Sequence, residues 1–164
     1  LISVSALGQS VDYLIDTSDF HQLTPREREL LTELTPEVKA ATGAKKLAMY
    51  EHMYNQMNDN DVWPKYAQNM YDYAVSAEGL PDSARSLYKC IYYNDIAYYN
   101  VYKGEVGKGL ESYYKSLRIA EDNNFTLRIA QAYNNLGGIY DDLGEKIMMA
   151  VSNFVSKIHN LCLH

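Results

Sequence analysis

The sequence predicts an all-α fold, and three observations support this prediction. Apolar residues recur at steps of three and four along most of the chain, which is the period of an amphipathic helix. No segment shows the sustained alternation of apolar and polar residues that a half-buried strand requires. All four prolines lie before residue 82, so the last 83 residues can form long helices without interruption.

The first predicted helix begins at about Pro25. Thr24 is placed as its N-cap, Pro25 occupies the first turn, and Glu27 stands three residues after Thr24, as in a capping box. We expect Pro36 to interrupt or restart this helix, because proline lacks the N–H that a helix interior uses. Gly43 is expected to end this helical section.

Two further helices are predicted over 45–58 and from Pro64 to Gly79, joined by a polar turn, and we expect them to form a hairpin. Each has an apolar stripe at helical spacing. The stripe residues are Leu47, Tyr50, Met53, Tyr54 and Met57 in the first, and Tyr66, Ala67, Met70, Tyr71 and Ala74 in the second.

The second half contains four predicted helices, over 82–103, 107–122, 125–143 and 145–163. Gly104 and Gly144 end two of them, and Asn123 with Asn124 forms a turn and an N-cap. The clearest periodicity in the chain is the stripe Ile129, Ala132, Tyr133, Leu136, Ile139, Tyr140 and Leu143.

One helix pair carries a motif, Tyr133-x2-Leu136-Gly137-x2-Tyr140, followed by Ala150 and Phe154 on its second helix. This motif resembles the tetratricopeptide repeat. Forty residues earlier, related residues stand at Tyr93, Ile96 and Ala97, and weaker matches extend the resemblance over three pairs, 45–80, 82–122 and 125–160.

The resemblance implies a right-handed superhelix of antiparallel helix pairs, with a repeat domain over 23–164. The spacing of 40 to 42 residues between pairs exceeds the usual 34 and is similar to the long-period variety found in sensory regions of bacterial regulators. HEAT-like pairs have a similar period but do not require the Leu-Gly-x2-Tyr step. The resemblance assigns Tyr71, Tyr93, Tyr113, Tyr133 and Tyr140 to packing positions between helices.

Charge and hydropathy exclude some partners. The chain has 15 Lys and Arg against 21 Asp and Glu, a net charge of −6, which is the wrong sign for a protein that neutralises a phosphate backbone. We therefore expect no direct nucleic-acid partner. No apolar run approaches the roughly 18 residues that cross a bilayer, so no transmembrane segment is expected in this chain.

Residues 1–22 are predicted to be an N-terminal leader. Ala6 and Gly8 have the small-x-small spacing of a secretory cleavage site, which would place the cut between Gly8 and Gln9. This favours a periplasmic or secreted location over a cytoplasmic one, and the alternative is an ordinary flexible N-terminus.

No constellation of catalytic residues is apparent, so we expect a non-enzymatic protein without a cofactor. His159, Cys162 and His164 could in principle ligate a metal, but they lie on a terminus without a second cluster, and no metal site is expected. The glycines at 104, 107 and 109 follow a helix rather than a strand, which favours a helix turn and a packing site over a phosphate loop. The state of Cys90 and Cys162 is left open.

A binding groove is the remaining candidate site. In the family, the first helix of each pair lines a concave surface, and asparagine and tyrosine side chains suit an extended peptide. The candidate groove residues are Asn94, Tyr98, Tyr102, Gln131, Asn134, Asn135 and Asp141, with Ile91, Val101, Gly138 and Asp142 beside them and, from the first pair, Met49, His52, Gln56, Asp59 and Asn60. Tyr98 and Tyr102 equally fit a role in packing against the neighbouring pair.

These observations lead to a functional hypothesis. The chain is expected to be a non-catalytic protein- or peptide-binding module, the sensory or interaction region of a bacterial signalling or transcriptional regulator. The alternative is a structural assembly protein whose repeats pair with a second copy, as a homo-oligomer.

Overall fold

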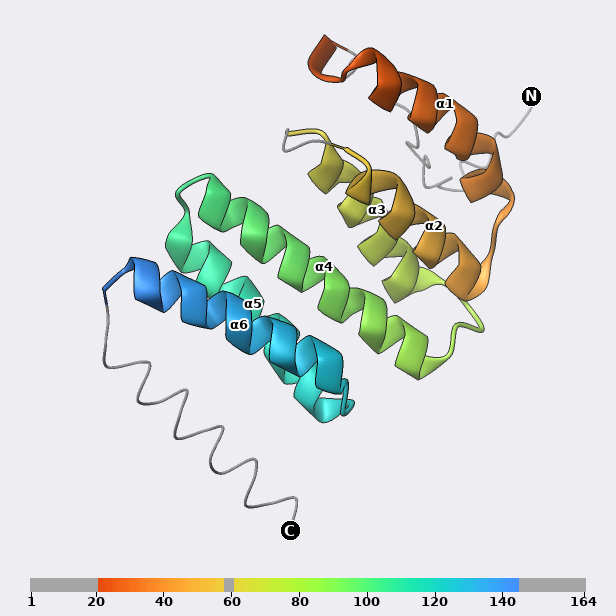
Figure 1. The fold of residues 1–164 in the computed structure, drawn as a ribbon. Helices are drawn as coiled ribbons and strands as arrows, with labels where there is room; N and C mark the ends of the chain where they lie inside the picture. Colours follow the sequence, from red (N-terminus) through yellow and green to blue (C-terminus); the bar gives the residue numbers. More distant parts are fainter. Residues whose placement is uncertain (1–20, 58–60, 145–164) are drawn as a thin grey trace, which may run out of the picture. The chain divides into compact units, whose positions relative to one another are not determined.

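The computed structural model describes residues 21–57 and 61–144 (Figure 1). The predicted leader over 1–20, Asp59 and Asn60, and the predicted helix over 145–163 with His159, Cys162 and His164 lie outside the described residues. Within the described ranges the regular structure is helical, which confirms the all-α class. The helices are α1 (Pro25–Ala40), α2 (Gly43–Asn55), α3 (Trp63–Ser76), α4 (Asp82–Tyr102), α5 (Val106–Asp122) and α6 (Thr126–Asp142).

The chain divides into two compact units, with the boundary between Tyr73 and Ala74, inside α3. We describe each unit by itself. The single repeat domain over 23–164 stays a prediction. No helix in the described part of the chain is long and apolar enough to cross a membrane.

The start of α1 confirms the predicted capping box. The backbone N–H of Glu27 donates to Thr24 Oγ1 at 3.3 Å, and the backbone N–H of Thr24 donates to Glu27 Oε2 at 2.7 Å. Two of the N–H groups that lack a partner at a helix start are thereby satisfied.

The prediction that Pro36 interrupts this helix is wrong. α1 continues through Pro36 to Ala40. Leu31 and Val38, on either side of the proline, are fully buried, and this packing holds the helix together where one backbone hydrogen bond is missing. The hydroxyl of Thr35 also donates to the carbonyl of Leu31 at 2.5 Å. Gly43 does not end α1 but begins α2, with a φ of 60°.

In the first unit, α2 and α3 run antiparallel, as the predicted hairpin requires. The rings of Tyr54, near the end of α2, and Trp63, at the start of α3, stack at 5.8 Å between centroids. At the opposite ends, the N–H of Gly43 donates to the hydroxyl of Tyr73 at 2.8 Å. The predicted stripes form the core, and their buried members in this unit are Leu47, Tyr50, Met53, Tyr54, Tyr66, Ala67 and Met70. Ala74, which is also buried, belongs to the second unit.

In the second unit, α5 lies antiparallel to both α4 and α6 (Figure 1). Near the start of α5, Gly109 lies against the backbone of Ala97 and Val101. Further along α5, the hydroxyl of Ser116 donates to the carbonyl of Cys90 at 2.8 Å. The apolar core of this unit consists of Ala97, Tyr113, Leu117, Ala132, Leu136 and Ile139.

Three details of this unit differ from the expectations. The N-cap of α6 is Phe125, not an asparagine, and Asn124 instead takes the left-handed conformation, with a φ of 56°, that ends α5. Leu143, the last residue of the predicted stripe, is 49% exposed because it follows the end of α6. Of the four tyrosines of this unit that were assigned to packing positions, only Tyr113 is buried, and Tyr93, Tyr133 and Tyr140 are half-buried, as is Tyr71 in the first unit.

Candidate functional site

The candidate site lies where α4 and α6 meet. Asn135 Nδ2 donates to Asn94 Oδ1 at 2.9 Å, and Asn94 Nδ2 donates to Asp95 Oδ1 at 3.1 Å. Asn94 is 7% exposed, so this amide is buried with its hydrogen-bonding capacity in use. The amide pair, which is our name for Asn94 and Asn135, therefore joins two helices that belong to different predicted repeats.

A second interaction gives the direction of the two helices. The guanidinium of Arg128, near the start of α6, acts electrostatically on Cys90 of α4. The amide pair lies further along both helices, so α4 and α6 advance together and run parallel, as Figure 1 also shows. Arg128 Nη1 in addition donates to Gln131 Oε1 at 3.0 Å.

The structure places most of the other candidate groove residues at the surface, but the prediction is wrong for Ile91, which is buried, and Val101 packs against the apolar core. Tyr98 and Tyr102 are 49% and 60% exposed, so these two tyrosines face solvent rather than filling the space between helices. Asn134 and Asp141 are exposed, and Gln131 is half-buried. The structure therefore brings Asn94 and Asn135 into contact and leaves the side chains of Tyr98, Tyr102 and Asn134 accessible along the same two helices.

The candidate residues from the first predicted pair belong to the other unit. His52 and Gln56 are exposed, and Met49 is half-buried. They are not assigned to the α4 and α6 site.

Buried polar contacts fix α4 against α5 beneath this surface. Cys90 Sγ lies 3.2 Å from Ser116 Oγ and 3.4 Å from the carbonyl oxygen of Ser116. Burial raises the pKa of the Cys90 thiol above its ordinary value of 9.0, so the group is held as a neutral thiol. Cys90 thus has a packing role, and the thiolate needed for nucleophilic chemistry is disfavoured.

Sequence reasoning missed several polar contacts between α5 and α6. The hydroxyl of Tyr133 donates to Glu121 Oε1 at 3.0 Å, and the hydroxyls of Tyr114 and Tyr140 lie 3.0 Å apart. These contacts explain why two predicted core tyrosines are only half-buried, because each keeps its hydroxyl at a polar partner. No local spacing in the sequence pairs residues that are 12 or 26 positions apart.

The end of α6 is acidic. Asp141 and Asp142 are both exposed and occupy its last turn, which contains no basic residue. Carboxylates at a helix C-terminus lie at the negative end of the helix dipole and are unfavourable there by roughly 0.3–1 kcal/mol each. These two residues therefore reduce the stability of the helix that carries them.

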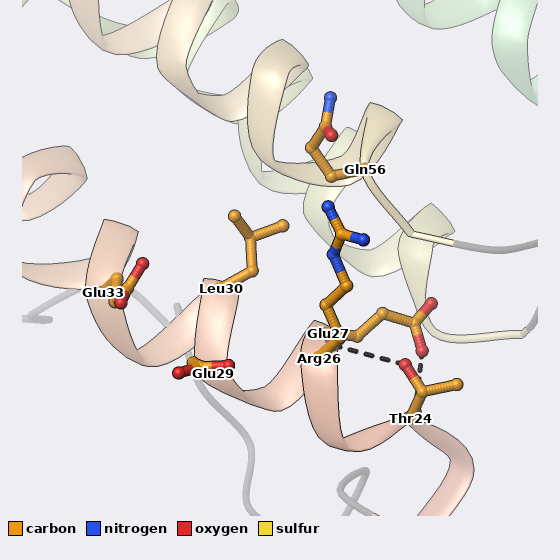
Figure 2. Close-up of a pocket in the computed structure, with 7 residues that line it drawn as sticks. All are labelled: Thr24, Arg26, Glu27, Glu29, Leu30, Glu33 and Gln56. Atoms are coloured by element: carbon orange, nitrogen blue, oxygen red, sulfur yellow. Dashed lines mark hydrogen bonds between the residues drawn. The ribbon is translucent and has the colours of Figure 1, made fainter.

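A separate cavity of about 390 Å³ lies in the first unit, along α1 and next to the end of α2 (Figure 2). Figure 2 shows Arg26 and Leu30 of α1 directed toward Gln56. The Glu27 carboxylate accepts the hydrogen bond from the Thr24 N–H in the capping box. The polar residues of this cavity are mostly exposed, and Gln56 alone among its lining residues belongs to the predicted groove set. Its lining consists of Thr24, Arg26, Glu27, Glu29, Leu30, Glu33 and Gln56.

Among residues 21–57 and 61–144, no three His, Cys, Asp or Glu side chains lie close enough together to hold a metal ion. Comparison of the chain with protein-family models, with curated proteins and with solved structures finds no match.

Proposed function

We propose that this protein is a non-catalytic binding module that holds a peptide or protein segment on the face shared by α4 and α6. The amide pair is the observation that carries the proposal. It links the two parallel helices in a defined register, and exposed polar and aromatic side chains follow it along both of them.

The chemistry of these side chains suits an extended peptide. An asparagine amide offers both donors and an acceptor, so exposed Asn134 can bond to a peptide N–H and C=O together. Tyr98 and Tyr102 each have a flat apolar ring and a polar hydroxyl, which suits binding at an interface that is partly buried and partly exposed to solvent.

The proposal includes the finer architecture. The helix pairs would be successive turns of a right-handed superhelix of tetratricopeptide type, with α4 and α6 as the first helices of two neighbouring pairs. Antiparallel packing of α4 on α5, and the parallel direction of α4 and α6, support this arrangement. In this proposal the module is the sensory or interaction region of a bacterial regulator.

The experiment begins with a selection of random twelve-residue peptides displayed on phage. Enriched peptides are synthesised with a fluorescent label and titrated with the protein, and binding is followed by anisotropy. We expect Asn134→Ala to weaken binding by about five-fold, the loss of roughly one hydrogen bond. Asn55→Ala, an exposed asparagine on α2, is the matched control and is expected to leave affinity unchanged.

Hydrogen exchange locates the bound peptide. Protection should appear on the amides of α4 and α6 near the amide pair. Protection confined to α5, together with unchanged affinity in Asn134→Ala, would contradict the proposal.

Self-assembly is a second candidate function. Several large apolar side chains are exposed, and Leu127, in the first turn of α6, is 77% exposed. Single exposed apolar residues are common on monomers, so this observation favours self-assembly only weakly relative to the groove.

A further inference from the structure

The exposed tyrosines of α4 lie on the face that meets α6. Asn94 reaches α6 through its bond to Asn135, and Tyr98 and Tyr102 follow Asn94 at steps of four, which keeps them on that face. About half or more of each tyrosine is exposed. α4 thus presents two aromatic side chains, one turn apart, immediately after its buried amide.

The facing part of α6 carries an acid at the same level. Gly138 and Asp142 follow Asn135 at steps of three and four, so they share the face that meets α4. Parallel helices rise by about 1.5 Å per residue, so the register set by the amide pair predicts that Asp142, seven residues after Asn135, is level with position 101 of α4, one residue before Tyr102. Asp141 is adjacent on the exposed side.

Gly138 leaves this part of α6 without a side chain. Gly138 is exposed, and an added Cβ there would meet no described atom within 4 Å. A residue in the middle of a helix is seldom glycine, because glycine costs about 1 kcal/mol relative to alanine. The helix therefore leaves room beside Tyr98 where most sequences would place a side chain.

Negative charge predominates at the end of α6. Asp141 and Asp142 make no ion pair within the described residues, and α6 contains no Lys or Arg after Arg128. The nearest cation along α4 is Lys103, whose Nζ lies 5.9 Å from the ring centroid of Tyr99. Two carboxylates at the negative end of a helix, beside exposed aromatic rings, are complementary to a cation.

We propose that the bound segment carries a lysine or arginine side chain, which stacks on Tyr98 and Tyr102 and pairs with Asp141 and Asp142. This inference rests on the proposed peptide-binding function and specifies the chemistry of its ligand. A long basic side chain fits because its aliphatic stem packs on the rings while its charged end reaches the carboxylates. The cation also interacts favourably with the negative end of the α6 dipole.

Four synthetic pools of acetylated nonapeptides test this inference. Each pool has random residues around a fixed central residue, which is Arg, Lys, Gln or Glu. The full chain is passed over each immobilised pool and the retained protein is measured. We expect the Arg and Lys pools to retain at least about five-fold more protein than the Gln pool, with the least on Glu.

Two double variants with the same change in net charge separate the site from bulk charge. D141N/D142N is expected to reduce the preference for Arg over Gln to below about two-fold. E29Q/E33Q removes two exposed carboxylates from α1 and should keep the full preference. Y98L/Y102L keeps apolar surface but removes the aromatic faces, and should lower retention on the Arg and Lys pools more than on the Gln pool.

Three results would overturn the inference, and they are distinguishable. Equal loss of preference in D141N/D142N and E29Q/E33Q would show that overall charge alone causes it. Equal retention of the protein on all four pools, together with reduced retention of Asn134→Ala, would contradict the preference for a basic side chain but would support the peptide-binding function. Absence of retention on every pool would overturn both proposals.

Discussion

At the scale of single residues, Gly109 determines how closely α5 approaches α4. A Cβ at this position would collide with Cγ2 of Val101 and would lie 3.0 Å from the carbonyl oxygen of Ala97 and 3.3 Å from the backbone N of Val101. Backbone atoms of a packed helix cannot move aside cheaply. The sequence predicted a packing glycine here, and the structure confirms it.

We expect Gly109→Ala to lower the free energy of unfolding by about 1–3 kcal/mol, because steric overlap outweighs the helical preference of alanine. Gly107→Ala, two residues earlier in the same helix, meets no atom within 4 Å and should be neutral or stabilising by up to about 1 kcal/mol. Urea denaturation of both variants measures the difference. Equal effects of the two substitutions would contradict the close approach.

Because of two tyrosines, the stability of the second unit should vary with pH in the alkaline range. Burial, with smaller effects of Asp95 and Tyr98, raises the pKa of Tyr113 to about 12 from its ordinary 10.0. Burial and then the hydrogen bond to Glu121 raise the pKa of Tyr133 to about 12. The unfolded chain thus loses these protons first, so their contribution to stability is complete below about pH 10 and is lost as pH rises to about 12.

We therefore expect the free energy of unfolding to fall between about pH 10 and about pH 12, and Tyr113→Phe to show a smaller fall than the wild type. Urea denaturation at several alkaline pH values measures this slope. The same slope in the variant and the wild type would show that Tyr113 does not contribute.

At the scale of elements, the end of α3 depends on a side chain from the next helix. Arg85 Nη1 donates to the carbonyls of Ala74 and Val75 at 2.5 and 2.6 Å, and its Nη2 donates to that of Ala77 at 2.9 Å. Carbonyls at a helix C-terminus lack partners within the helix, and a guanidinium supplies several donors together.

Arg85→Gln should lower the free energy of unfolding by about 1–3 kcal/mol and increase hydrogen exchange in the last turn of α3, because charged hydrogen bonds are lost. Arg118→Gln, on the exposed side of α5, is the control and should change stability by less than about 0.5 kcal/mol. Unchanged exchange at the end of α3 in Arg85→Gln would contradict this capping role.

The helices themselves were largely predictable, and their contacts were not. Predicted and observed bounds of α4, α5 and α6 agree closely because apolar periodicity and the glycines that follow α4 and α6, Gly104 and Gly144, are local signals. Pro36 was misjudged because the burial of Leu31 and Val38 is a tertiary effect that overrides a local preference. The partners of Arg85 were not foreseeable, since neither spacing nor helical period specifies them.

At the scale of the whole molecule, the candidate site was predicted in part. The resemblance to a repeat placed Asn94 and Asn135 on related helices, and the structure shows them bonded. It left the location of Tyr98 and Tyr102 open, because an aromatic pair at a step of four has the same pattern at a surface as in a core. Only the packing of α4 among its neighbours determines that these rings are exposed.

The proposed binding function and the self-assembly alternative differ in oligomeric state. With a net charge of −6 and scattered exposed apolar residues, we expect the full chain to stay monomeric across the micromolar range. Sedimentation velocity at several concentrations measures this. A fraction of dimer that increases with protein concentration, and that is smaller in Leu127→Asn, would favour self-assembly instead.

The amide pair between α4 and α6 contains no group that titrates. Its hydrogen bond is also not an ion pair, so dissolved salt does not screen it as it screens exposed charges. The register of the two helices should therefore persist in solutions that would dissociate a basic ligand from Asp141 and Asp142. Such a surface could be emptied by concentrated salt and filled again on dilution, with the helices beneath it unchanged throughout.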